Sequence, residues 1–596
     1  MPSNSNKLSR FWQELKRRRV IHVITVYASA AFVIIELVNN LTEPLNLPTS
    51  LSTVVIIVLA VGFPLAIILS WIYDLTGEGF ERTTPMEELP DDRKAKVPNA
   101  WKIATYVSFV VIVGLVALNI VKSGDLIKPG MIRSMVVLPF HNYTGDEDLE
   151  YFVAGMHSSL IGDMGKVSGL RIISETTANA FKNVDKSIPE IASEIGVDAI
   201  IEPTVTCLGD TICLQVKVFS AFPEEKLLWV AEYREDKGNM LNLYNRITRQ
   251  IADEVEVELT ETEERRLSGS KKVDKDAYDY YMKGLQYWNQ LNQMSLQKAL
   301  DLVNRAIELD PDFAPAYAGV AEVWLGLAQM GLTPPDIAGP KIFEYLDKAI
   351  QLDPEYPRAH YNRARVAVWT EWKWDKGERE FLKALAVNPN DAYSRAHYAH
   401  LLIMLRRTRE ALVHSRLAID LDPLNPFILT FHGIVLEEAG LYQEATEVIG
   451  KAYEMTPDSY FIQHRFHHIL EKNEEYEKAF ELEKRYLNFG EDVIKSLDRI
   501  FKEQGRLAAY EQIVDLYEMR VQDSYVSPLW IGEKYIQIGQ YEKGIDYIEK
   551  AYEIHDPNMP YLGTRIVFGD YDELHDNPRY LNILRKMNLP LPGHDL

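Results

Sequence analysis

The sequence predicts a multidomain protein with transmembrane helices first, then a small α+β domain, then an all-α repeat solenoid. Three observations carry this prediction. Long apolar runs are confined to the first 122 residues, a stretch of alternating strand and helix patterns follows, and a spacing of 34 residues recurs through the second half. The chain has 596 residues. That length fits several structural units at about 150 residues each.

Three apolar runs predict membrane-spanning helices. They cover residues 20–38, 54–73 and 103–121, and each approaches the ~20 residues that a helix needs to cross the hydrocarbon core. A cleaved signal peptide is the alternative for the first run, because Ala28-Ser29-Ala30 resembles a cleavage site. Since the apolar run continues past this tripeptide and a second run follows, we expect a retained three-helix segment over 20–122.

The distribution of basic residues predicts the orientation of this segment. Six Lys and Arg residues precede the first span in the tail 1–19, and five lie in the connection 74–102, whereas the connection 41–52 has none. Basic connections stay on the cytoplasmic side of a membrane. We therefore expect a cytoplasmic N-terminus and a cytoplasmic loop 74–102, with everything after Val121 on the far side.

A compact α+β domain is predicted after the third span, over residues 131–262. Short β-rich runs alternate with segments whose apolar residues have helical spacing. Gly209-Asp210 separates two of the runs and suits a tight hairpin turn. The expected strands are 134–140, 170–174, 198–207, 212–219 and 227–232, and the expected helices are 146–167, 188–195 and 240–259.

Several runs in this domain carry a resemblance to a known family. They are VVLPFHNYTGDEDLEYFVAGM (136–156), LRIISETTANAFK (170–182), EIASEIGVDAIIEPTV (190–205) and LLWVAEY (227–233). Together they resemble the FlgO-like domain, which is similar to the N-terminal domain of TolB and occurs in bacterial envelope and regulatory proteins. The resemblance implies a bacterial protein. Together with the three predicted spans and their orientation, it leads us to expect an inner-membrane protein whose C-terminal domains lie in the periplasm.

The N-terminal segment resembles the membrane part of the same multidomain group. The resemblance lies in residues 11–34 and 62–82. Members of that group often carry a nucleotide cyclase or winged-helix domain at the cytoplasmic end. Only about twenty residues precede the first span here, so the resemblance does not bring either activity to this chain.

The chain has two cysteines, Cys207 and Cys213. Two thiols exclude a four-thiolate zinc or iron–sulfur site. They flank the predicted Gly209-Asp210 turn, and in an oxidising periplasm a cross-strand disulfide between them is possible. The alternative is two half-buried free thiols in a different strand register, and the sequence leaves both open.

A repeated motif predicts the solenoid. The stretches AIELDP, AIQLDP, ALAVNP, AIDLDP and AYEMTP end at prolines spaced 43, 35, 34 and 34 residues apart. This pattern resembles the tetratricopeptide repeat (TPR), in which small Ala positions let two helices approach and Pro closes the second helix. We expect such helix pairs from Ala277 to Gly569, within a superhelix over 275–590. The nine extra residues of the first spacing are expected in a loop around 332–335.

Such arrays present a concave groove lined by the first helix of each repeat. Alignment of the repeats on their prolines predicts a set of groove residues in which aromatic rings stand beside Arg, Asn and His, a combination that suits a peptide. The alternative is that these side chains pack against neighbouring helices. The predicted groove residues are Arg358, Tyr361, Asn362, Arg365, Tyr393, His397, His400, Phe427, Phe431, His464, Arg465 and His468.

Catalytic and metal motifs are missing from the sequence. His464 and His468 have the i,i+4 spacing of a metal pair, with His397 or His400 as a possible third ligand, but the stretch HRFHH lacks the glutamate of a zinc protease. The chain has no phosphate-binding glycine loop, dinucleotide fingerprint or nucleophile elbow. We expect no catalytic residue, no metal and no cofactor.

These observations predict a non-enzymatic, membrane-anchored scaffold whose α+β domain and TPR array bind protein or peptide partners in the cell envelope. The alternative is a transmembrane receptor that senses a ligand outside the cytoplasm and acts through a separate cytoplasmic output protein. Nucleic acid is not an expected partner, because 87 Asp and Glu residues against 64 Lys and Arg give a net charge of −23. The sequence does not identify the partner or the oligomeric state.

Overall fold

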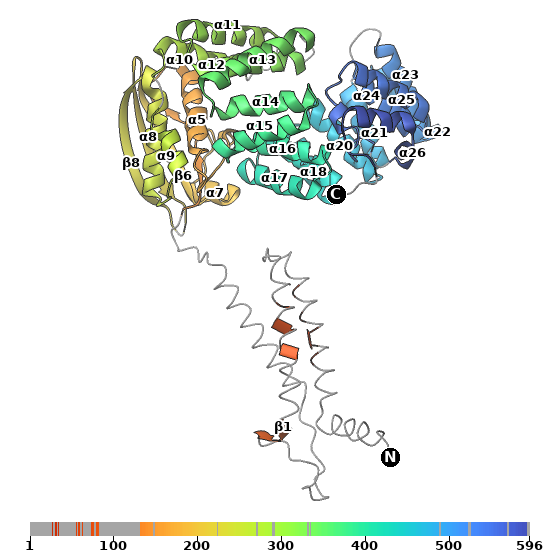
Figure 1. Ribbon diagram of the computed structural model, residues 1–596, viewed down its shortest axis with the longest axis horizontal. Helices are drawn as coiled ribbons and strands as arrows, with labels where there is room; N and C mark the ends of the chain where they lie inside the picture. The colour runs from red at the N-terminus through yellow and green to blue at the C-terminus, as the bar shows by residue number, and fades with distance from the viewer. Residues whose placement is uncertain are drawn as a thin grey trace, which may run out of the picture. The chain divides into compact units, whose positions relative to one another are not determined.

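The computed structural model divides the chain into two units, Met1–Pro129 and Gly130–Leu596, and each is described by itself (Figure 1). The second unit is described almost throughout. The described residues are isolated positions between Tyr27 and Phe63, the hairpin Tyr73–Thr76 and Gly79–Arg82, and 132–592 without 147–148, 223, 270–271, 289–292, 330–332, 334, 488–489, 522–525 and 569–570.

In the first unit, the described residues between Tyr27 and Phe63 are helical. Ile34, Val55 and Leu59 are buried against one another, and the Tyr27 hydroxyl donates a hydrogen bond to the Leu59 carbonyl at 2.8 Å. Residues on either side of the connection 41–52 therefore pack together in this unit.

The predicted cytoplasmic loop 74–102 overlaps a short hairpin that sequence analysis missed. Strand β1 (Tyr73–Thr76) pairs antiparallel with β2 (Gly79–Arg82). The basic tail 1–19 and most of the three predicted spans lie outside the described residues. Among the residues that are described, none forms a helix with both the length and the apolar character needed to cross a membrane.

The α+β domain is built on one mixed sheet with the strand order β5-β3-β6-β7-β8, and β4 also pairs with β6. Pairing is parallel among β5, β3, β6 and β4, and antiparallel from β6 through β7 to β8. The strands are β3 (Ser134–Val137), β4 (His141–Asn142), β5 (Arg171–Ile172), β6 (Ala199–Leu208), β7 (Thr211–Ser220) and β8 (Lys226–Asp236).

Helices cover both faces of this sheet. Neighbouring residues of a strand point to opposite faces, and Val137 accordingly packs with side chains of α5 and α8, whereas Val136 packs with those of α7. The domain therefore has two separate cores. Its helices are α5 (Glu150–Met164), α6 (Glu175–Asn179), α7 (Ile188–Ile195), η2 (Lys237–Asn239), α8 (Met240–Glu254) and α9 (Glu261–Leu267).

Helix α7 has the predicted bounds, but other predicted elements are wrong in part. The expected strand 134–140 ends at Val137 as β3, and β4 starts only at His141, after Pro139, which has no N–H to donate. The expected strand 170–174 keeps two strand residues and passes into α6, which was missed. The expected helix 240–259 ends at Glu254, and α9 then starts with a capping box of Thr260 and Glu263.

The second half is a TPR-like all-α solenoid of antiparallel helix pairs, each packed on the next. The first helices of these pairs are α10 (Lys275–Trp288), α12 (Ala314–Gln329), α14 (Pro357–Trp369), α16 (Ala392–Met404), α18 (Pro426–Glu438), α20 (Tyr460–Lys472), α22 (Glu491–Gln504) and α24 (Pro528–Gln537). The second helices are α11 (Gln293–Leu309), α13 (Pro335–Leu352), α15 (Trp374–Val387), α17 (Thr408–Leu421), α19 (Tyr442–Met455), α21 (Tyr476–Leu487), α23 (Arg506–Arg520) and α25 (Tyr541–Glu553).

The extra nine residues of the first spacing do not form only a loop. Helices α12 and α13 have 16 and 18 residues, whereas α14 and α15 of the next pair have 13 and 14. Pro335 starts α13 instead of lying in the loop, because proline is tolerated at the first turn of a helix. The insertion therefore lengthens both helices of the pair.

The α+β domain and the first repeats share one hydrophobic core. Tyr278 of α10 is 1% exposed, and its ring meets Phe152 of α5 edge-on with the centroids 5.7 Å apart. The ring of Tyr278 also contacts that of Phe313, which precedes α12, with the centroids 6.3 Å apart. The cluster that contains these residues runs from Ile132 of the sheet domain to Leu327 of α12.

Two turns between repeats also dock on the α+β domain. The Asn390 side chain accepts a hydrogen bond from Ile172 N at 3.0 Å and donates to the Gly165 and Leu170 carbonyls. Farther along, the buried Asp422 carboxylate accepts from both the backbone N–H and the hydroxyl of Thr177. The α+β domain and the repeat array, which the short linker around residue 269 joins, are thus in extensive contact.

The last elements of the chain pack back on the middle of the array. They are η3 (Met559–Tyr561), α26 (Asp572–His575) and α27 (Pro578–Lys586). Trp374 of α15 donates its indole N–H to the Met587 carbonyl at 2.8 Å, and Trp372 stacks on His555 with the centroids 4.3 Å apart. One buried cluster therefore holds residues of α14–α16 together with residues after 558.

Candidate functional site

All twelve predicted groove residues lie on the first helices of four successive repeats. Arg358 to Arg365 are in α14, Tyr393 to His400 in α16, Phe427 and Phe431 in α18, and His464 to His468 in α20. These first helices contact one another from repeat to repeat. The 34-residue spacing alone placed the twelve residues on neighbouring elements.

Five rings from these helices form a continuous series, which we call the aromatic ladder: Tyr361, His397, Phe431, Phe461 and Phe427. The ring centroids of Tyr361 and His397 are 5.6 Å apart, those of His397 and Phe431 4.9 Å, and those of Phe431 and Phe461 5.7 Å. Phe461 stacks on Phe427 at 6.2 Å with an interplanar angle of 14°. Phe427 is 40% exposed, whereas Tyr361 is 5% exposed, so the ladder runs from the interior to the surface.

A second aromatic group lies where α20 meets α24. His464 stacks on Trp530 at 5.3 Å and on Tyr460 at 6.2 Å, and Tyr460 is 40% exposed. We call these three rings the Trp530 stack. Each of the three side chains has an apolar ring face and a polar N–H or hydroxyl group at its edge. Side chains of this kind dominate protein interfaces.

Sequence reasoning missed Phe461, Tyr460 and Trp530. Phe461 follows Phe427 by one 34-residue period, so the same alignment of repeats contained the signal for it. Trp530 comes from α24, two repeats beyond α20. The return of α24 toward α20 leaves no local signal in the sequence.

The polar residues of α14 are engaged within the chain. Arg358 makes a forked ion pair with Glu322 of α12, with nitrogen–oxygen distances of 2.7 and 3.2 Å. The charge of Glu322 raises the pKa of Arg358. Arg365 lies over the ring of Tyr361, 5.4 Å from its centroid, and Asn362 is fully buried. These contacts favour the alternative of packing within the array for this part of the predicted set.

His400 lies under the C-terminal elements. It is 1% exposed, its Nδ1 is 2.7 Å from the Tyr561 hydroxyl of η3, and its Nε2 is 3.1 Å from the Phe431 carbonyl. A carbonyl only accepts, so Nε2 carries the proton and Nδ1 accepts from the tyrosine. Burial lowers the pKa of His400 to about 4, so the ring is neutral. His400 therefore packs against neighbouring elements, which is the alternative to a ligand-facing position.

Arg465 and His468 are also buried and also pack within the array. Arg465 contacts the Glu437 carboxylate at 2.7 Å and His468 Nδ1 contacts it at 2.9 Å. Burial alone would raise the pKa of Glu437, but the charges of His468 and Arg465 outweigh it and lower that pKa to about 2. Glu437 is fully buried in α18, and we name these three residues the buried ion cluster.

The predicted histidines do not converge as metal ligands. His464 stacks on Trp530, His468 pairs with Glu437, and His397 Nδ1 donates to the Tyr393 carbonyl 2.9 Å away. In the described residues, no group of three or more His, Cys, Asp or Glu side chains is arranged to hold a metal ion.

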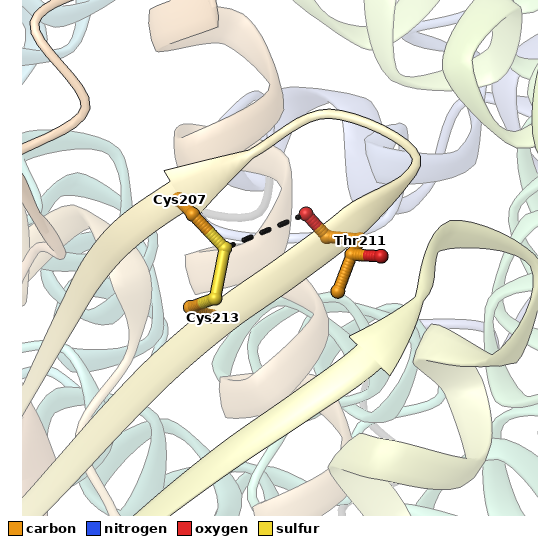
Figure 2. The surroundings of a disulfide bond; sticks show 3 residues. All are labelled: Cys207, Thr211 and Cys213. Carbon is orange, nitrogen blue, oxygen red and sulfur yellow. Dashed lines mark hydrogen bonds between the residues drawn. A yellow bond between two sulfur atoms is a disulfide. The ribbon is translucent and has the colours of Figure 1, made fainter.

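Cys207 and Cys213 form a disulfide in the β6–β7 hairpin (Figure 2). Their Cα atoms are 4.9 Å apart and face each other in the strand register, which shifts between Val205 and Cys207. The Thr211 carbonyl lies 3.6 Å from Cys207 Sγ. The bulge in β6 is what sets the two cysteines opposite each other.

Two cavities lie away from the aromatic ladder and the Trp530 stack. One of ≈ 630 Å³ is lined by residues of α12 and α13, including Tyr317 and Tyr345. The other, of ≈ 300 Å³, lies among α19, α20 and α21 and includes Tyr453 and Phe466. The candidate site is a surface of partly exposed rings, separate from these two cavities.

Comparison with known proteins gives partial matches, and no family model matches the chain. It is 30% identical over 239 residues to the putative adenylate cyclase 3 of Rhizobium meliloti, which is 40% of each chain. It is 29% identical over 148 residues to the transcriptional regulator HilA of Salmonella typhimurium, 25% of this chain and 27% of that protein. The chain thus spans less than half the length of these curated relatives.

Among solved structures, the chain is similar to PilW, a type IV pilus biogenesis factor, with a TM-score of 0.32, 14% identity, and coverage of 38% of this chain and 100% of that one. It is also similar to the human IFIT1 dimer with m7Gppp-AAAA, with a TM-score of 0.34, 15% identity, and coverage of 53% and 78%. Both TM-scores are below 0.5, so the functions of these two proteins are not transferred to this chain. The resemblance of residues 131–262 to the FlgO-like domain stays a prediction.

Proposed function

We propose that the chain is a non-enzymatic, membrane-anchored scaffold whose TPR-like array binds a protein or peptide partner outside the cytoplasm. The observation that carries the proposal is the exposed end of the aromatic ladder beside the Trp530 stack. Phe427 and Tyr460 are each 40% exposed, and both start first helices of neighbouring repeats. Exposed rings that are held in place by stacking lose little conformational entropy when they bind a partner.

The disulfide supports the proposed side of the membrane. Disulfides persist in oxidising compartments such as the bacterial periplasm and are rare in the reducing cytosol. The bond joins Cys207 and Cys213, which follow the third predicted span and belong to the predicted periplasmic part. An alkaline-phosphatase fusion after Val121 is expected to be active, and an inactive fusion would contradict the proposed location.

Photo-crosslinking in living cells tests the proposed binding surface. We would replace Phe427 with a photoreactive phenylalanine analogue and expect a covalent adduct to one defined protein. The matched control is the same analogue at Val413, which is 57% exposed but lies on α17, a second helix. Adducts of equal yield and identity from both positions, or none from 427, would contradict the proposal.

Once that protein is identified, Phe427→Ala is expected to weaken its binding about tenfold, the effect of losing one well-packed aromatic anchor. Val413→Ala is expected to leave the affinity unchanged. Isothermal titration with the purified full chain measures both values.

A signalling receptor is the second candidate function, and the similarity to a putative adenylate cyclase and to a transcriptional regulator favours it. In this candidate, ligand capture by the array changes which cytoplasmic protein binds the loop 74–102. Crosslinking from that loop, with and without the partner identified through Phe427, separates the two functions. A loop contact that depends on this partner favours the receptor, whereas a loop without such a contact favours the scaffold.

A further inference from the structure

The two edges of the mixed sheet differ in how they are protected. The β5 edge has two residues, and the repeat turn covers it, since Asn390 accepts from Ile172 N and donates to the Leu170 carbonyl. The β8 edge has 11 residues, Lys226–Asp236. In the described part of the chain, β7 is the only strand that pairs with β8, and Figure 1 shows β8 at the outer margin of this unit.

The composition of β8 leaves the middle of its free edge unprotected, although Lys226 and the stretch Glu232–Asp236 carry charges at its two ends. Proteins usually guard a long edge strand with charges, proline or bulges. The stretch Leu227–Ala231 has neither a charged residue nor a proline, and Leu227 and Val230 are each 48% exposed. A bulge occurs near the start of the strand, where Trp229 pairs with Val218 and Leu227 with Phe219. From Trp229 onward the strand is regular and open to pairing.

We propose that β8 pairs antiparallel with β8 of a second copy of this chain, around a two-fold axis at Ala231, and joins two sheets into one. The axis follows from the sequence of the strand. Along a strand, every second residue points its N–H and C=O to the free edge. Two residues directly opposite each other in an antiparallel pair must both point toward the partner strand or both point away from it. In a pairing of two identical strands, the numbers of opposite residues therefore have an even sum. This leaves only a few registers.

Charge selects one of these registers. With Ala231 opposite Ala231 of the second copy, Trp229 faces Tyr233 twice, and the Lys226 end of each strand lies beside the Glu235–Asp236 end of the other. A register centred on Glu232 would oppose two glutamates, and one centred on Val230 would put Lys226 beside Arg234. Like charges opposite each other destabilise a strand pair, and opposite charges or aromatic pairs stabilise it.

A charge-reversal pair at Val230 tests the interface. In the proposed register Val230 faces Glu232 of the second copy, so Val230→Glu opposes two carboxylates twice in each dimer, whereas Val230→Lys forms two opposite-charge pairs. For the full chain in detergent or nanodiscs, light scattering and sedimentation are expected to show a dimer. Val230→Glu is expected to raise the dimer dissociation constant about tenfold, and Val230→Lys to change it by less than about threefold.

Cysteine crosslinking tests the register. Ala231→Cys lies on the axis and is expected to form a disulfide between copies on mild oxidation. Arg234→Cys is the control, because it lies opposite residue 228 and therefore about 20 Å from its own counterpart. Circular dichroism of each variant confirms that the fold is kept. A monomeric wild-type chain, equal dimer constants for the two Val230 variants, or crosslinking of Arg234→Cys without Ala231→Cys would each overturn the proposal.

Discussion

The buried ion cluster shows how a single residue can have a role that its neighbours in the sequence do not reveal. The stretch HRFHH suggested a ligand-binding or metal-binding surface, yet both Arg465 and His468 face Glu437 of α18, which lies 28 residues before Arg465. The repeat period located α20 correctly. It did not reveal that a carboxylate in the apolar stretch FHGIVLEE would point at those side chains, because only the packing of α18 on α20 brings them together.

The pKa of Glu437 predicts a loss of stability in acid. Its folded-state pKa is about 2 against an ordinary value of 4.5, so the carboxylate stabilises the fold fully above pH 4.5, and this contribution is lost as the pH falls toward 2. Glu437→Gln is expected to lower the unfolding free energy by about 3–5 kcal/mol at pH 7, because Arg465 is left buried without its partner.

Urea titrations at pH 7 and pH 3 measure this difference. The gap between the wild type and Glu437→Gln is expected to narrow at pH 3. Glu454→Gln, a change at an exposed glutamate of α19, serves as the control and is expected to match the wild type at both values. A gap that stays constant between pH 7 and pH 3 would refute the assignment of the charge to Glu437.

At the scale of elements, the prolines of the repeats predicted where helices end but not which turns carry tertiary contacts. Pro389 and Pro423 close second helices as expected, and Asp391 and Asn425 cap the next first helices. Asn390 and Asp422 of these turns bind the α+β domain, whereas the corresponding turn at Asp458 is exposed. The motif is the same in each repeat, so the sequence pattern does not distinguish a docked turn from a free one.

Asn390→Ala is expected to destabilise the fold by about 2–3 kcal/mol. It leaves the Ile172 N–H and the Leu170 carbonyl without their partner, and an unsatisfied buried polar group costs about 1–3 kcal/mol. Chemical denaturation measures the change. Asp458→Ala, one change at the equivalent turn position, is the control and is expected to stay within about 0.5 kcal/mol of the wild type. Equal effects of the two substitutions would show that docking of the turn does not contribute.

For the whole molecule, the sequence predicted an α+β domain and a repeat solenoid in the correct order but gave no sign of their fusion. Periodicity reports which face of an element is apolar and not which element covers that face. Tyr278 and Phe313 look like ordinary repeat residues, yet they complete the core under α5. The same holds for the candidate site. The sequence identified the helices that carry its residues, but it did not predict that C-terminal residues such as Tyr561 would pack over His400.

The shared core predicts how fragments behave. Residues 130–596 are expected to unfold in one cooperative transition, because one hydrophobic cluster crosses the predicted boundary between 262 and 275. Residues 275–596 alone are expected to aggregate or to melt at a clearly lower temperature, because Tyr278 loses the cover of α5. Size-exclusion chromatography and thermal denaturation of both fragments check this. A monodisperse 275–596 fragment with the melting temperature of 130–596 would contradict it.

The bond from Trp374 to the Met587 carbonyl has a consequence for how the chain acquires its structure. In an ordinary repeat array each unit contacts only its neighbours, so the first units can become stable while later ones are still being synthesised. Here the core of the middle repeats includes residues after 558. The interior of those repeats is therefore complete only after more than 150 further residues have been synthesised. During synthesis, Trp374 and its neighbours are therefore expected to stay exposed as an apolar surface of the kind that chaperones recognise.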